Sequence, residues 1–408
     1  MDKASQLAYA DLLLRVGLNL QPGQNLMIGG EPVHWDFANV LAEQAYALGA
    51  RYVDTMLVHP AFTKVRIQHS PEEYLSYFPC YAEAKFRGMV DEDFASLRLE
   101  GSAFPHLFQD IDQDRNAILT KARNGVRAPF RSAAMSGKVA WCVAGVPTDA
   151  WAERVLGEAS ADALWEELVP ILRLDQEDPV ATWKGLAEAL LRRSTCLNER
   201  HLVRLHFEGP GTDLSVSLLA RASWCGGSIV RPSGEAFVPN LPTEEVFTSP
   251  DYRLTTGRAR VTRPVEVLGY EVVGAWFEFV DGRVVDFGAD EGRSRLETFF
   301  DIDPRARSLG EIALVDGASP IFKSGHIFHS ILFDENAACH MALGSSYADT
   351  YENGGEMSED ALYEAGLNQS ILHTDFMIGS EEITVTGYTS DEEAVSVIEA
   401  GRFCDAFR

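Results

Sequence analysis

The 408-residue sequence is poor in positive charge, with 35 lysines and arginines against 61 aspartates and glutamates. The formal net charge of −26 argues against nucleic acid or an anionic membrane surface as a partner, because both would repel the protein. A solvated acidic surface explains this excess most simply. No apolar run approaches the length of a membrane-spanning helix. We therefore expect neither nucleic acid nor a membrane among the partners.

Cysteine is also sparse, and no Cys-x-x-Cys pair occurs among the six cysteines. Scattered cysteines in a chain of this length are typical of reduced thiols and not of a disulfide framework. The N-terminal residues lack the basic start, apolar core and cleavage pattern of a signal peptide. We expect a cytoplasmic protein. Cys339 precedes His340, but neighbours on a strand face opposite ways, so we expect Cys339 to be buried packing.

The length exceeds that of one ordinary core, so we expect two domains. In the first half, a strand at 25–28, a helix at 35–48 and a strand at 52–57 predict a βαβ unit with parallel pairing. The glycines at 29–30 lack the further glycines of a dinucleotide fingerprint. Helical patterns dominate residues 71–121, and Asp178-Pro179 predicts the start of a helix that runs to about Arg193. We predict an α/β N-terminal domain over residues 1–196.

The second half becomes rich in strands from His201 onward. The clearest hairpin joins 276–280 to 283–285 through Asp281-Gly282, a pair that suits a type I′ turn. We predict an α+β C-terminal domain over residues 197–408, with mainly antiparallel strands. Trp276, Phe277 and Phe279 are predicted to fill its core.

The segment 373–380 carries a histidine and an aspartate two positions apart, His373 and Asp375. On an extended strand both side chains point the same way. An imidazole and a carboxylate side by side suit a divalent metal with nitrogen and oxygen ligands. Alone the pair is weak, since a hydrogen-bonded histidine and a capping aspartate would look the same.

Several other segments strengthen the metal hypothesis. Each of three places a carboxylate against small or turn-forming residues and an apolar run, and a fourth contains His340 and Tyr347: 240–248, 308–314, 333–336 and 339–347. Together these blocks, in this order, closely resemble the M29 family of metalloaminopeptidases, the aminopeptidase T and aminopeptidase S group. A looser likeness extends to the N-terminal half.

The resemblance implies a metal-dependent aminopeptidase that removes N-terminal residues from peptides. It also implies a homodimer that encloses the active site, and two divalent ions per chain (Zn, Co, Mn or Mg). It assigns Tyr347 as the catalytic tyrosine and Glu311 as the carboxylate that bridges the ions. The implied ligands are Glu245, Glu311, His340, His373 and Asp375. We add Glu335, five residues before His340, as a further ligand or a proton acceptor.

The chemistry of peptide hydrolysis fits this donor set. Two ions about 3.5–4 Å apart can share a hydroxide, polarise the carbonyl and hold the tetrahedral oxyanion. Several carboxylates are needed to balance four positive charges, and a hydroxyl donor near the oxyanion contributes about 3–4 kcal/mol. The resemblance therefore implies hydrolysis by a metal-bridged hydroxide, with Tyr347 as the donor.

Other assignments remain open at this stage. Glu244 adjoins Glu245, and only one of the two is expected to face the metals. His326 and His329 form a His-x-x-His that the family motifs do not include, so we interpret them as structural. A related set of proteins on the same scaffold resembles mononuclear iron dioxygenases that open hydroxypyridine rings, and this activity is the alternative function for the chain. A non-catalytic binding protein is a third possibility. Retention of both Glu245 and Glu311 favours the two-metal hydrolase.

Overall fold

The computed structural model describes residues 1–408, which divide into two compact units. The first contains residues 1–184 and 228–242, and the second contains residues 185–227 and 243–408. Helix α9 (Pro179–Glu199) includes residues of both units. The boundary of an independent domain at residue 197 stays a prediction.

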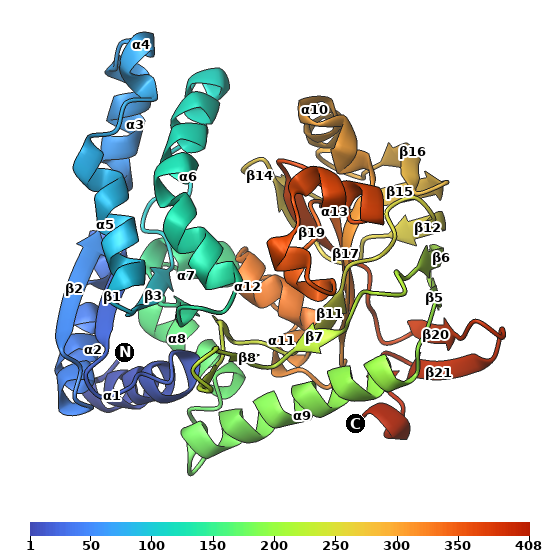
Figure 1. The fold of residues 1–408 in the computed structure, drawn as a ribbon, viewed down its shortest axis with the longest axis horizontal. Coiled ribbons are helices and arrows are strands. Elements are labelled where there is room, and N and C mark those ends of the chain that lie inside the picture. The colour runs from blue at the N-terminus through green and yellow to red at the C-terminus, as the bar shows by residue number, and fades with distance from the viewer. The chain divides into compact units, whose positions relative to one another are not determined.

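The first unit is built on a five-stranded sheet with parallel pairing throughout (Figure 1). Its strand order is β10-β4-β3-β1-β2. The strands are β1 (Asn25–Gly30), β2 (Tyr52–Leu57), β3 (Phe94–Glu100), β4 (Trp141–Gly145) and β10 (Asn240–Leu241). Helix α2 (Trp35–Ala47) joins β1 to β2, which confirms the predicted βαβ unit.

Further helices complete the first unit. They are α1 (Lys3–Leu12), α3 (Pro60–His69), α4 (Glu72–Leu75), α5 (Cys80–Asp91), α6 (Gln113–Met135), α7 (Asp149–Leu156) and α8 (Ala161–Ile171). The helical prediction for residues 71–121 was wrong at β3. Alternate residues of this strand are buried, a period of two that a short run among helical patterns does not reveal.

Local signals set the ends of several helices. Asp178 Oδ1 accepts the backbone N–H of Ala181 at 2.9 Å, and Pro179 opens α9. A capping carboxylate followed by proline was the predicted start of this helix. The helix continues to Glu199, beyond the predicted end near Arg193, because no glycine or proline interrupts it there.

The second unit contains a five-stranded sheet that is antiparallel throughout, in the order β19-β18-β17-β11-β7. We call it the small sheet. Its strands are β7 (Cys225–Gly226), β11 (Glu245–Thr248), β17 (Leu309–Val315), β18 (His340–Gly344) and β19 (His373–Met377). The predicted predominance of antiparallel pairing is confirmed.

An eight-stranded antiparallel sheet forms the rest of the second unit's framework, in the order β16-β15-β12-β6-β5-β20-β21-β22. Its strands are β5 (Arg204–Gly209), β6 (Thr212–Ser217), β12 (Thr256–Arg260), β15 (Trp276–Val280), β16 (Arg283–Gly288), β20 (Thr384–Tyr388), β21 (Ala394–Glu399) and β22 (Arg402–Phe403). Asp281 and Gly282 both have positive φ between β15 and β16, as a type I′ turn requires.

Short elements occupy the connections of the chain. They are β8 (Ile229–Val230), β9 (Ala236–Phe237), β13 (Val265–Val267), β14 (Tyr270–Val272), α10 (Arg293–Ile302), α11 (Pro320–Ser324), α12 (Ile331–Asp334) and α13 (Glu359–Ala365). No helix of the protein combines the length and the apolar character needed to cross a membrane.

One hydrophobic core takes side chains from both sheets of the second unit. The rings of Phe277 on β15 and Phe376 on β19 meet edge-to-face, with centroids 4.9 Å apart. Cys339 is buried in this core, as predicted. Phe277 and Phe279 also lie in it, but the prediction for Trp276 was wrong. Its side chain is half-buried beneath the guanidinium of Arg258, because alternate residues of β15 face away from the core.

Candidate metal centre

The small sheet has two faces of opposite character. Ile312, Met341 and Phe376 belong to the hydrophobic core. Side chains alternate along strands, so the intervening residues of β17, β18 and β19 share the other face. There, Glu311 and Asp375 both lie opposite Ala342 of the strand between them. The small alanine side chain leaves the space above it to the two carboxylates.

The same face carries the two histidines and the third carboxylate. His340 lies two residues before Ala342 on β18, and His373 lies two before Asp375 on β19. Glu245 on β11 lies opposite Val315, four residues beyond Glu311 on β17. Alternation therefore brings all five predicted ligands to one face, including the pair His373 and Asp375.

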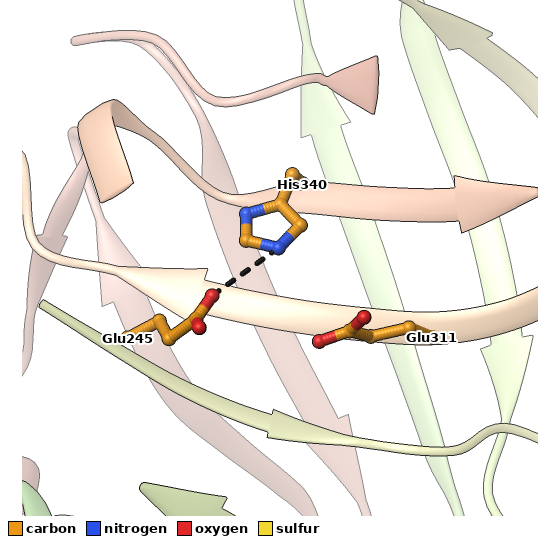
Figure 2. Close-up of side chains that lie close together, drawn as sticks. All are labelled: Glu245, Glu311 and His340. Atoms are coloured by element: carbon orange, nitrogen blue, oxygen red, sulfur yellow. Dashed lines mark ion pairs between the residues drawn. The ribbon is translucent and has the colours of Figure 1, made fainter. Parts of the chain in front are cut away.

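Their ligand atoms form two groups, and within each group all atoms lie within 4.8 Å of one another. The first contains Glu245, Glu311 and His340, and Figure 2 shows these side chains with the ion pair between His340 and Glu245 as a dashed line. Nε2 of His340 lies 3.3 Å from Oε2 of Glu245. The second contains Glu311, His373 and Asp375. Nε2 of His373 lies 3.3 Å both from Oε2 of Glu311 and from Oδ1 of Asp375. Glu311 is common to both groups.

Backbone carbonyls orient both imidazoles. Nδ1 of His373 lies 2.8 Å from the carbonyl of Ser345, and Nδ1 of His340 lies 3.3 Å from that of Ala338. A carbonyl only accepts, so each Nδ1 carries the proton of the bond. In the neutral rings, Nε2 then keeps a lone pair directed at the carboxylates, the arrangement found in metal-ligating histidines.

The pKa values of the side chains on this face show that it favours cations. Burial and the nearby charges of Glu311 and Asp375 raise the pKa of Glu245 to about 7, although His340 opposes the shift. Oε2 of Glu245 is buried and accepts no hydrogen bond. Burial lowers the pKa of both imidazoles, but the carboxylates outweigh it, so that both pKa values lie above the ordinary value.

Buried carboxylates in mutual contact are unfavourable unless cations compensate them. Glu311 and Asp375 are 4 % and 7 % exposed, and the ion pairs of the three carboxylates are formed with His340 and His373. Three oxygen donors and two nitrogen donors suit divalent transition metals. The residues therefore fit a metal site.

Tyr347 follows β18 and is half-buried beside the second group. Its hydroxyl lies 3.4 Å from Nε2 of His373, and its ring packs edge-to-face on Phe247 of β11, with centroids 5.7 Å apart. Burial, reinforced by Glu311, raises the pKa of Tyr347 well above its usual range. The hydroxyl therefore keeps its proton and can donate it in a hydrogen bond.

Glu335 belongs to neither group of ligand atoms. It follows α12, and Asn336 donates to its Oε1 at 3.5 Å. Burial raises its pKa well above the ordinary value, and the charges of Glu245, Asp375 and Glu311 add to the shift. Glu335 therefore lies close enough to affect the donor set electrostatically. Glu244, His326 and His329 are also outside both groups.

Sequence reasoning did not identify the residues that hold Tyr347. Ser249 Oγ accepts the N–H of Tyr347 at 3.3 Å. Thr350 Oγ1 donates to the Tyr347 carbonyl at 2.7 Å and lies 2.8 Å from Ser249 Oγ. Asn368 fixes the segment before Tyr347: its side chain donates to the carbonyl of Gly344 at 2.6 Å, and its backbone N–H and C=O bond to Ser346. Their only signal in the sequence is the proximity of Thr350 to Tyr347.

A buried face of carboxylates and imidazoles in a mixed α/β chain suits a metal-dependent enzyme. The family model described as thermophilic metalloprotease (M29) matches residues 3–403. The chain therefore belongs to the M29 peptidase family.

Individual relatives agree with the family over nearly the whole chain. Identity is 38% over 399 residues to Aminopeptidase 2 of Geobacillus stearothermophilus, covering 97% of this chain and 96% of that protein. It is 36% to Aminopeptidase T of Thermus aquaticus, covering 97% of each. The solved structure of wild-type AmpT from Thermus thermophilus superimposes with a TM-score of 0.90 at 33% identity, covering 98% of this chain and 99% of that chain.

Proposed function

We propose that this M29 metalloaminopeptidase removes the N-terminal residue of peptides with two divalent ions held on the small sheet. One ion would bind to Glu245, Glu311 and His340, and the other to Glu311, His373 and Asp375. The observation that supports this arrangement is the presence of Glu311 in both groups of ligand atoms. A carboxylate with two oxygens can bind one ion through each, so Glu311 is the proposed bridge.

When bound, such ions lower the pKa of water and polarise the scissile carbonyl. The chain's own groups supply the remaining functions. Tyr347 donates its phenolic hydrogen to the carbonyl oxygen as negative charge develops there. The Ser345 carbonyl keeps Nε2 of His373 directed at the site by accepting from Nδ1.

Glu335 is the proposed proton acceptor. Its carboxylate accepts a proton from the attacking water and passes it to the amine of the departing peptide. Its place outside both groups of ligand atoms, with strong electrostatic influence from Glu245 and Asp375, supports this role better than that of a ligand.

Two further proposals rest mainly on the family resemblance. The chain is proposed to act as a homodimer in the cytoplasm. All six cysteines are free, which supports a reducing compartment. Sedimentation equilibrium at several protein concentrations tests the dimer, and a single species of monomer mass would exclude it.

A mononuclear iron dioxygenase is not favoured. The relatives carry aminopeptidase names, and Glu245, Glu311 and His340 would add a second group of donors that one iron does not need. The deciding experiment combines metal analysis with release of amino acids from a panel of dipeptides. Two ions per chain with release of the N-terminal residue support the proposal. One iron per chain together with oxygen consumption would support the dioxygenase instead. Protein fully loaded with metal but without hydrolysis would indicate a binding protein.

A further inference from the structure

Strand β19, which carries His373 and Asp375, lies at the edge of the small sheet and pairs only with β18. An edge strand has backbone N–H and C=O groups on one side that no neighbouring strand satisfies. On β19 these groups belong to the same residues that supply two proposed metal ligands.

The pairing with β18 determines which groups point outward. Leu372 accepts the N–H of Ser345 at 2.7 Å, and Cys339 accepts the N–H of Ile378 at 2.8 Å. In an antiparallel pair, hydrogen-bonded and non-hydrogen-bonded positions alternate. Thr374 and Phe376 therefore bond to β18, whereas the N–H and C=O groups of His373, Asp375 and Met377 point away from it.

One end of this outer edge is satisfied within the protein. The carbonyl of Met377 accepts the backbone N–H of Thr262 at 2.8 Å and the hydroxyl of Thr262 at 3.2 Å. No neighbouring strand bonds to the outward N–H and C=O groups of His373 and Asp375, and the N–H of Asp375 contacts only its own carboxylate. Asp375 is 7 % exposed, whereas His373 and Thr374 at the start of β19 are partly exposed. Edge-strand groups that no strand of the chain satisfies can bond to an added strand.

We propose that the outer edge of β19, at His373 and Asp375, binds the main chain of the peptide substrate as an added strand. This inference rests on the proposed function, because it assigns the binding mode of the same substrate. An extended peptide offers N–H and C=O groups at alternate residues, with the spacing that His373 and Asp375 present. Its N-terminal residue then lies towards the donors on the sheet face, and the residues after the cleaved bond follow β19.

The binding mode has a consequence for selectivity. Main-chain hydrogen bonds are common to all peptides, so residues after the cleaved bond contribute affinity with little dependence on their side chains. Alternate amides of the substrate face β19 and the others face away. Methylation of a substrate amide nitrogen removes one hydrogen-bond donor. The resulting decrease in kcat/KM should therefore alternate from residue to residue along the substrate.

A series of pentapeptides methylated singly at the amide nitrogens of residues 3, 4 and 5 tests this alternation on the metal-loaded enzyme. We expect kcat/KM to fall about 3- to 10-fold where the amide faces β19, the change that the loss of one hydrogen bond produces, and to stay unchanged at the neighbouring position. Most of the change should appear in KM. Equal values across the series, or a uniform decrease, would overturn the proposal.

Hydrogen exchange supplies a readout that does not depend on turnover. A pentapeptide whose first amide bond is replaced by a methyleneamine serves as the bound probe. Its binding should slow exchange of the His373 and Asp375 amides at least several-fold. The Thr374 amide, already bonded to β18, is the internal control and should not change. Binding of the probe without protection at His373 and Asp375 would refute the proposal.

The two experiments separate this inference from the proposed function. If the unmodified pentapeptide loses its N-terminal residue but shows neither alternation nor protection, only the added strand is wrong. If the metal-loaded protein cleaves no unmodified peptide, the proposed function itself fails.

Discussion

The hydroxyl of Tyr347 lies 3.4 Å from Nε2 of His373, so the proposed oxyanion donor adjoins a proposed metal ligand. Tyr347→Phe removes the hydroxyl and leaves the ring packed on Phe247. We expect kcat to fall about 100-fold, the effect of losing one oxyanion donor, with unchanged metal content. Turnover and metal analysis of the same preparation provide the test. Wild-type turnover in this variant would remove Tyr347 from the mechanism.

Thr350 is a positioning residue for Tyr347, because its buried hydroxyl donates to the Tyr347 carbonyl and lies 2.8 Å from Ser249 Oγ, which accepts the Tyr347 N–H. Thr350→Val keeps the shape and leaves that carbonyl without this donor. We expect a loss of about 1–3 kcal/mol in the free energy of unfolding. We also expect kcat to fall about 10-fold through displacement of the phenol, with little change in KM.

Thr350→Ser is the matched control, since it keeps the hydroxyl and should restore most of kcat. If the valine variant is destabilised yet turns over at the wild-type rate, Thr350 is structural only. The result for Tyr347→Phe remains independent of this outcome.

The two groups of ligand atoms predict different metal losses. His340→Ala removes a donor from the first group alone, and His373→Ala removes one from the second alone. Each variant should keep one of the two ions, whereas Glu311→Gln should weaken both sites. Elemental analysis after gel filtration measures the bound metal. Equal metal content in all three variants and the wild type would contradict the assigned ligands.

Removal of the metals should make stability depend on pH in a defined direction. The pKa of Glu245 is raised from 4.5 to about 7 in the metal-free fold, so between these values the folded state binds more protons than the unfolded state. Stability therefore decreases as pH rises from about 4.5 to about 7. The raised pKa of His373 acts in the same direction, because its contribution is lost as pH rises through its folded value.

Metal binding competes with these protons, so the difference in Tm between metal-loaded and metal-free protein should grow as pH rises from about 5 to about 7. Thermal unfolding with and without a chelator measures it. Glu245→Gln is the control, because it removes one titrating group and should flatten the curve of the metal-free protein. A difference that shrinks with rising pH would show that the five donors do not bind the metal.

Local signals in the sequence were enough for several features. The Asp178-Pro179 start of α9 and the Asp281-Gly282 turn formed as expected, because caps and tight turns depend on a few adjacent residues. Alternation along one strand also predicted that His373 and Asp375 share a face. Family resemblance supplied the other donors, which no spacing in the chain connects.

What the sequence determined by itself is the set of donors and the local conformation around each. The tertiary structure alone decided that β11, β17, β18 and β19 are neighbours, in a register that places Ala342 between Glu311 and Asp375. It also decided that Glu335 lies outside both groups of ligand atoms and that β19 is an edge. The physical reason is that strand order and register come from the packing of residues far apart in the chain, and local propensity does not encode which strands meet.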